Sequence, residues 1–172
     1  VCAADVDGDG YMDIVASVYH QGKIIWHRND GQQKFTEHLV ASDSNGVYRV
    51  VAADVDRDGD IDVLAASVID RKIAWHDNDG SENFQERIIS TDLPERPHAR
   101  WFQAADMDGD GDTDVLSPTS RNGKPAWHEN DGAGNFTEHV IRHSENNKAL
   151  SWKLKDLARI HLTTMFASES HK

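Results

Sequence analysis

Short blocks of apolar and polar residues alternate along this chain, and the same order of blocks returns three times. Apolar, largely β-branched runs such as residues 14–16, 63–66 and 115–116 follow acidic stretches and are bounded by Gly, Asn and Asp. Runs of this length and composition predict strands and turns rather than helices. Each period holds four such segments: one before the acidic stretch, one after it, one through a Trp and one after a Phe.

The period itself predicts the architecture. The tract Trp-His-x-Asn-Asp-Gly begins at Trp26, Trp75 and Trp127, at intervals of 49 and 52 residues, and a Phe follows each Gly at four residues (Phe35, Phe84, Phe136). Fixed periods of this size indicate solenoids, propellers or arrays. Four antiparallel strands in roughly 50 residues are typical of a β-propeller blade. We therefore predict an all-β fold of three tandem four-stranded blades, over residues 1–46, 47–97 and 98–143.

The acidic stretches carry the candidate chemistry. Each reads Asp-x-Asp-x-Asp-Gly-x-x-Asp, at residues 5–13, 54–62 and 106–114. Four carboxylates in nine residues repel one another unless a hard cation with six to eight oxygen ligands binds them, and calcium accepts such a flexible oxygen cage. Residue six is always Gly, where the chain must turn sharply. Residue seven varies, as expected if it offers only its backbone carbonyl.

This motif predicts three calcium sites. The predicted side-chain ligands are Asp5, Asp7, Asp9 and Asp13 in the first loop, Asp54, Asp56, Asp58 and Asp62 in the middle loop, and Asp106, Asp108, Asp110 and Asp114 in the third; the predicted carbonyl ligands are those of Tyr11, Asp60 and Asp112.

The loop, the downstream Trp-His-x-Asn-Asp-Gly tract and the following Phe together resemble the FG-GAP repeats of the VCBS type, which build integrin-like and other extracellular β-propellers. The resemblance covers residues 1 to about 143. It implies calcium in a loop between the first two strands of each blade, with the ligand positions given above. Two features depart from the family: the tripeptides that name it are absent, and Arg57 stands where the other loops have Gly8 and Gly109. We expect this positive charge to weaken the middle site.

The number of blades and the last residues set further expectations. Propellers typically need four to eight blades, so we expect a fragment, a processed chain, or a ring completed by further blades or other copies. Residues 144–172 break the repeat. Leu150, Leu154, Leu157 and Met165 fall at helical spacing and favour an amphipathic helix, while the alternation of Trp152 and Leu154 with lysines leaves the first strand of a fourth blade as the alternative.

Composition narrows the class of protein. The formal charge is −12, and twelve of the 30 acidic residues are predicted ligands, so three calcium ions would halve that charge. The acidity argues against nucleic-acid binding, which needs a basic face, and no apolar stretch approaches the ~20 residues that span a bilayer. The single Cys2 excludes an internal disulfide. Because loops of this kind need high free calcium, we expect an extracellular, secreted or cell-surface location.

Several features have two interpretations. An EF-hand would need a carboxylate at residue twelve and flanking helices, but that residue is Ala16, Ala65 or Ser117. Solvated acidic turns would not need the repeated Gly. The repeated histidines His27, His76 and His128 fit packing or hydrogen bonding better than a metal or catalytic site, because they recur once per blade. The Trp and Phe rows are predicted as core residues, with a sugar-stacking platform as the alternative for Trp.

The sequence contains no recognisable catalytic motif: Gly-x-Ser-x-Gly elbows, phosphate-binding loops and dinucleotide-binding fingerprints are absent. We therefore predict that the chain is not an enzyme. The favoured hypothesis is a calcium-binding extracellular module that recognises a glycan or a protein, as in adhesion. Two alternatives remain: a structural subunit packed against other chains, and a non-catalytic segment of a secreted enzyme that acts on polysaccharide.

Overall fold

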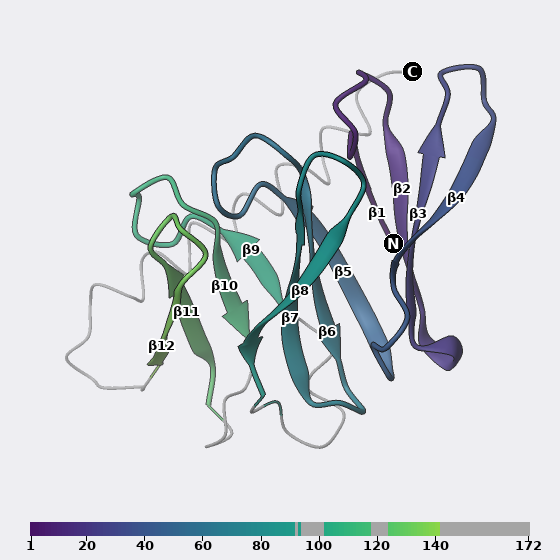
Figure 1. The fold of residues 1–172 in the computed structure, drawn as a ribbon. Coiled ribbons are helices and arrows are strands. Elements are labelled where there is room, and N and C mark those ends of the chain that lie inside the picture. The colour runs from purple at the N-terminus through teal and green to yellow at the C-terminus, as the bar shows by residue number, and fades with distance from the viewer. Residues whose placement is uncertain (92, 94–101, 118–123, 142–172) are drawn as a thin grey trace, which may run out of the picture. The chain divides into compact units, whose positions relative to one another are not determined.

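Three four-stranded antiparallel sheets make up the part of the chain that the structure describes (Figure 1). The structure is a computed structural model and describes residues 1–91, 93, 102–117 and 124–141. The first sheet contains β1 (Cys2–Ala4), β2 (Asp13–Val18), β3 (Lys23–Asn29) and β4 (Phe35–Ala41), with a 3-10 turn at Tyr19–Gln21 between β2 and β3. The second contains β5 (Val47–Ala53), β6 (Asp62–Ser67), β7 (Lys72–Asn78) and β8 (Phe84–Ser90), and the third β9 (Gln103–Ala105), β10 (Asp114–Ser117), β11 (Ala126–Asn130) and β12 (Phe136–Val140).

The strands of each sheet neighbour one another in sequence order. This is the connectivity predicted for a blade, so the all-β class and the three sheets of four antiparallel strands are confirmed. The fourth strand begins at the repeated Phe in every sheet. The helix predicted within residues 144–172 lies outside the described residues. In the described part of the chain, no helix is long and apolar enough to cross a membrane.

Two apolar clusters lie between the sheets. The first joins Val15, Ile24 and Trp26 of the first sheet to Val50 and Val63 of the second. The second joins Leu64, Ile73 and Trp75 of the second sheet to Phe102, in the segment before β9, and Val115 of the third. Strand β6 contributes to both, because successive side chains point to opposite faces of a sheet. Val63 and Leu64 therefore enter different clusters, and every residue of β6 is buried.

The repeated aromatic residues join neighbouring sheets. Trp26 and Trp75 are 1% and 0% exposed, which confirms the prediction that they belong to the core. Phe84 packs against the cluster that holds Trp26, and Phe136 packs against the cluster that holds Trp75. The prediction was wrong for Phe35, which is 46% exposed. In the described part of the chain no sheet precedes the first one, so Phe35 has no neighbouring Trp to cover it.

Candidate metal centres

The three acidic loops connect the first and second strands of each sheet and have the same backbone course. The Gly at loop position six has φ of 91°, 98° and 93° in Gly10, Gly59 and Gly111, a left-handed conformation that favours glycine. Its N–H donates to the first Asp of the loop, at 2.9 Å from Gly10 to Asp5 and 3.2 Å from Gly59 to Asp54. The loop therefore bends back over its own first carboxylate.

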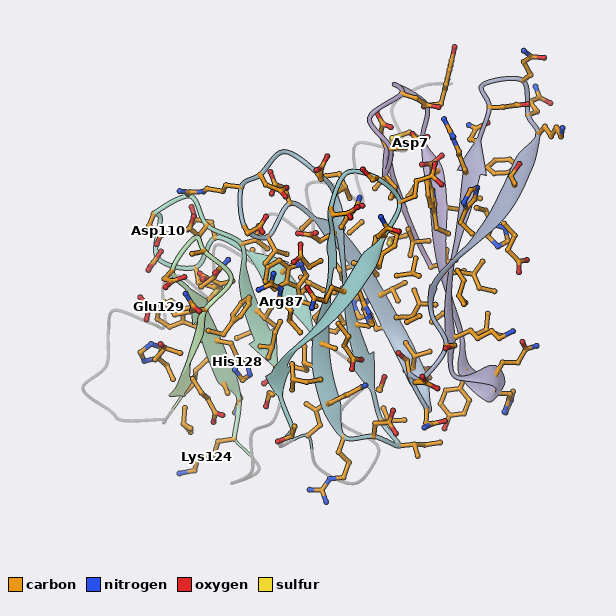
Figure 2. The ribbon with its side chains drawn as sticks, viewed as in Figure 1. Asp7, Arg87, Asp110, Lys124, His128 and Glu129 are labelled. Atoms are coloured by element: carbon orange, nitrogen blue, oxygen red, sulfur yellow. The ribbon has the colours of Figure 1, made fainter. Side chains whose placement is uncertain are left out.

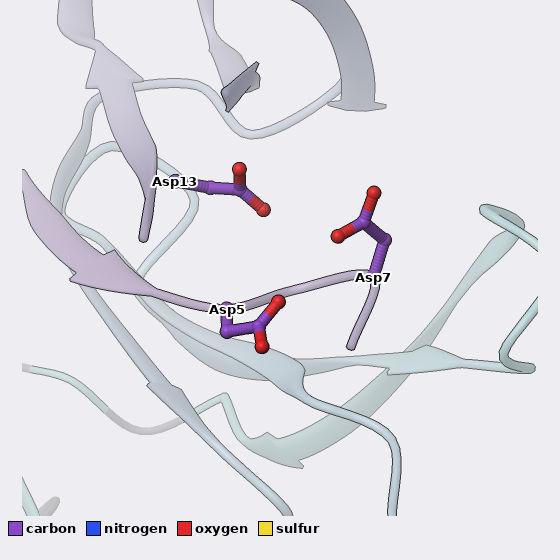
Figure 3. Close-up of side chains that lie close together, drawn as sticks. All are labelled: Asp5, Asp7 and Asp13. Carbon is purple, nitrogen blue, oxygen red and sulfur yellow. The ribbon is translucent and has the colours of Figure 1, made fainter. Parts of the chain in front are cut away.

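This bend brings carboxylates together in every loop. In the first loop, Asp5, Asp7 and Asp13 each place an oxygen within 4.8 Å of the others, and their side chains point toward one another (Figure 3). The same holds for Asp54, Asp56 and Asp58 in the middle loop and for Asp106, Asp108 and Asp114 in the third. Of the predicted side-chain ligands, Asp9, Asp62 and Asp110 lie outside these groups of three.

Several of the gathered oxygens lack a partner within the protein. Asp5 Oδ1, Asp54 Oδ1 and Asp56 Oδ1 are buried and accept no hydrogen bond. Burial, followed by the neighbouring charges of Asp58 and Asp77, raises the pKa of Asp56. Buried acceptors are normally satisfied, and a set of carboxylate oxygens with spare acceptor capacity suits a hard divalent cation. The residues present therefore fit a metal ion of that class.

The last Asp of each loop has a role that the ligand prediction missed. Asp13 is fully buried; its Oδ2 accepts from Val6 N at 3.1 Å and from Trp26 Nε1 at 2.9 Å, and its Oδ1 accepts from Asn29 N at 2.7 Å. Asp62 and Asp114 accept from the equivalent backbone groups. These carboxylates tie the loop to the third strand. The constant 13-residue interval from this Asp to the Trp is the sequence signal that could have indicated the pair.

Burial also affects the ionisation of these carboxylates. It raises the pKa of Asp62 to about 7, although hydrogen bonds from the backbone N–H groups of Asn78 and Val55 act in the opposite direction. Burial likewise raises the pKa of Asp114. A cation in the adjacent loop would favour the ionised form of both groups.

Comparison with known proteins agrees with this architecture. The model of the FG-GAP-like repeat matches residues 5–65 and again residues 58–117, which together make up more than half of the chain. The chain belongs to the FG-GAP-like repeat family. No curated protein sequence gave a match.

A solved structure shares the fold of these FG-GAP-like repeats. It is that of an Agrocybe aegerita lectin, described as recognising non-reducing terminal N-acetylglucosamine, with a TM-score of 0.61 and 19% sequence identity. The superposition covers 90% of this chain but only 41% of the lectin chain. The chain thus spans less than half the length of that protein, and at this identity the likeness concerns the fold.

The side chain at loop position seven packs over the hairpin that joins the third and fourth strands. The Tyr11 ring lies against Gly31, and the carboxylates of Asp60 and Asp112 lie against Gly80 and Gly132, where any β-carbon would overlap them. These hairpins contain the Asn-Asp-Gly tracts and run from the end of the third strand to the Phe that opens the fourth. The ligand role of the position-seven carbonyls stays a prediction.

An Asn of the same hairpin links neighbouring FG-GAP-like repeats. Asn130 Nδ2 donates to Val55 O of the preceding repeat at 2.7 Å and to Thr113 O of its own loop at 3.1 Å. Asn78 Nδ2 makes the equivalent bonds to Val6 O and Ile61 O. Each amide therefore holds two loops in register. The local sequence gives no sign of this link, because the partner in the preceding repeat lies more than 70 residues away.

Arg57 acts on a different loop from the one expected. Its φ of 62° is left-handed, like that of Gly8 at the same position. The guanidinium extends into the third loop, where Nε lies 2.5 Å from Asp112 Oδ1 and Nη2 donates to Asp110 O at 2.9 Å. The positive charge was predicted to weaken the middle site. The structure corrects this, because the side chain directs the charge onto the third loop.

Two of the three repeated histidines are buried packing residues rather than parts of a converging site. His76 and His128 are 1% and 2% exposed, and burial lowers the pKa of each to about 4. His128 Nε2 lies 3.4 Å from Ser117 Oγ (Figure 2 labels His128). In the part of the chain that the structure describes, the clusters with metal-ligand spacing consist of Asp alone.

Proposed function

We propose that this chain is a non-catalytic, calcium-binding module of FG-GAP-like repeats that works outside the cell. The observation that carries the proposal is the threefold convergence of loop carboxylates within 4.8 Å, with buried oxygens that no protein group satisfies in the first two loops. Calcium is the cation that a flexible set of carboxylate and carbonyl oxygens suits best. The millimolar free calcium outside cells would fill sites of moderate affinity.

The fold supports recognition of a glycan as the module's task. The lectin that shares the fold recognises a terminal sugar, and propeller-type blades present their loops on rigid sheets. Trp26 and Trp75 do not supply a sugar platform, because they are buried between sheets. Exposed aromatic rings lie elsewhere: Tyr48 is 45% exposed and meets Tyr19 edge to face at 6.3 Å between ring centroids.

A role in assembly is the second candidate, and one face of the first sheet favours it. Met12, Ile14 and Phe35 are 57%, 36% and 46% exposed. Their counterparts in the second repeat, Ile61, Val63 and Phe84, belong to or pack against the cluster shared with the first sheet. The first sheet thus exposes the surface that the second buries against its neighbour, so a further blade or another chain could pack there.

Calorimetric titration of the metal-free protein tests calcium binding. We expect a stoichiometry near three and weaker binding of zinc. Asp56→Asn, which alters an unsatisfied loop oxygen, should remove or weaken one site. Asp79→Asn, in the exposed hairpin of the same repeat, is the matched control and should leave all three. A stoichiometry of zero or one, or equal preference for zinc, would contradict the proposal. A glycan array probed with calcium-loaded protein then tests recognition, and a pull-down tests the assembly role.

A further inference from the structure

One basic side chain reaches into the first calcium loop from the third strand. Arg28 Nε lies 2.5 Å from Asp7 Oδ2, and Nη2 lies 3.6 Å from Asp9 Oδ2. Asp7 Oδ2 is buried, and its contact with the guanidinium is an ion pair without the alignment of a hydrogen bond. Both acids are predicted ligands of the first site. The positive charge of the Arg28 guanidinium therefore lies next to the position that the calcium ion would take.

The other two repeats carry an acid at the same position. Arg28, Asp77 and Glu129 each stand two residues after the repeated Trp. Asp77 is paired with Arg87, whose Nη2 is 2.6 Å away, and Glu129 with His139 at 2.5 Å (Figure 2 labels Arg87 and Glu129). In those repeats the acid is paired with a basic residue on the fourth strand. In the first repeat the charge is reversed, and Arg28 turns to the loop carboxylates instead.

Arg28 also has a partner outside the loop. Its Nη1 lies 3.4 Å from Glu82 Oε1, on the hairpin of the second repeat. Glu82 lies 3.3 Å from His38 Nδ1 as well, and His38 rests against the Trp26 ring. The guanidinium can therefore leave Asp7 and Asp9 and remain paired across the boundary between the two repeats.

We propose that Arg28 competes with calcium for the carboxylates of the first loop, so that this site has the lowest calcium affinity of the three. When the ion binds, the guanidinium leaves the loop carboxylates and stays paired with Glu82. This inference rests on the proposed calcium binding. Because Arg28 reaches Glu82 of the second repeat, filling the first site would be coupled to the contact between the repeats.

Coulomb repulsion sets the expected size of the effect. A unit charge about 4 Å from a doubly charged ion lowers its affinity by roughly thirtyfold at a water-like dielectric constant. Arg28 is 40% exposed, so salt screening and movement of the side chain reduce this factor. We expect Arg28→Gln to tighten one calcium step by about tenfold, which corresponds to about 1.4 kcal/mol. Raising the salt concentration should reduce the difference, because exposed charges are screened.

The test is calcium titration calorimetry on the whole chain and four variants. Arg28→Gln should tighten the weakest step alone, and Arg28→Lys, which keeps the charge, should tighten it less. Lys34→Gln removes an equal charge from an exposed position in the adjoining hairpin and is the matched control; it should bind as the parent does. Asp5→Asn should abolish the weakest step and leave the two tighter ones, which assigns that step to the first loop.

The outcomes separate the two proposals. Three calcium steps that Arg28→Gln leaves unchanged, or an Asp5→Asn variant that loses a tight step, would overturn the role of Arg28 and leave the proposed function intact. A chain that binds no calcium in any form would refute the proposed function, and the inference with it. Far-ultraviolet circular dichroism of each variant establishes that the fold is retained.

Discussion

Replacing Trp75 by Ala tests whether the contacts between neighbouring repeats stabilise the chain. Trp75 is fully buried between the second and third sheets. The Arg87 guanidinium carbon lies 4.9 Å from its ring centroid, and Gly134 of the third repeat approaches the ring so closely that a β-carbon there would overlap it. Truncation therefore removes a side chain that groups from two repeats surround.

The expected cost follows from the buried area and the cavity. A Trp side chain buries about 150–250 Å², worth roughly 4–6 kcal/mol at ~25 cal/mol per Å². Measured Trp→Ala changes in cores cost about 3–5 kcal/mol. The stacked Arg87 adds about 0.5–1 kcal/mol. We therefore expect a loss near 5 kcal/mol, or a melting temperature lower by on the order of 10–20 °C for a chain of this size.

Trp127→Ala is the matched control, because the residue type and its place in the repeat are the same. Trp127 is only partly buried, so the same truncation should cost less. Urea unfolding of both variants in saturating calcium, followed by circular dichroism rather than Trp fluorescence, measures the two free energies. Equal losses for the two variants would show that the neighbouring repeat adds nothing, and an unchanged Trp75→Ala variant would refute the packing argument altogether.

Three further predictions concern ions, protons and assembly. Calcium at a hundredfold excess over Kd should stabilise the fold by about 2.7 kcal/mol per site; identical melting curves in chelator and in calcium would contradict this. Burial lowers the pKa of His76 to about 4 from its ordinary 6.5, so as the pH falls the unfolded protein takes up a proton on His76 before the folded protein does. The free energy of unfolding should therefore fall between pH 6.5 and 4, by up to about 3 kcal/mol. The His76→Gln variant should lose less stability over this range than the parent, and parallel profiles would exclude His76 as the source of the slope. Light scattering should find the 172-residue chain associated through its exposed apolar face, and a stable monomer at micromolar concentration would show that no partner is needed.

Local pattern was enough to predict the strands, because each depends on residues close in sequence. The Phe at 35, 84 and 136 opens the fourth strand in every sheet, and the Gly at loop position six has the left-handed backbone that its type favours. The burial of Trp75 was also predictable, since a Trp in mid-strand that recurs in every repeat suits a core position. These features need no knowledge of which repeat lies beside which.

The contacts between repeats were not predictable in the same way. Arg57 bonds to a loop that lies about one repeat further along the chain, and Asn130 bonds to Val55 of the preceding repeat. A long side chain such as Arg can turn toward its own loop or the next one, and only the placement of neighbouring sheets decides between them. The exposure of Phe35 has the same origin, because its pattern equals that of Phe84 and only its neighbour differs.

The differences among the repeats therefore carry more functional information than their common motif. All three loops share the four Asp positions of the motif and the Gly at position six, yet the residue two places after the Trp is basic in the first repeat and acidic in the other two. That residue, Arg28, lies within ion-pair distance of two loop carboxylates, while Arg57 brings a positive charge to the third loop. The middle loop has no such cation among the described contacts, and burial, followed by the charge of Asp58, raises the pKa of Asp56 there. Since a cation binds more tightly where negative charge is left unbalanced, the middle site should fill first. The three sites share one motif, but the side chains around them should give them different calcium affinities.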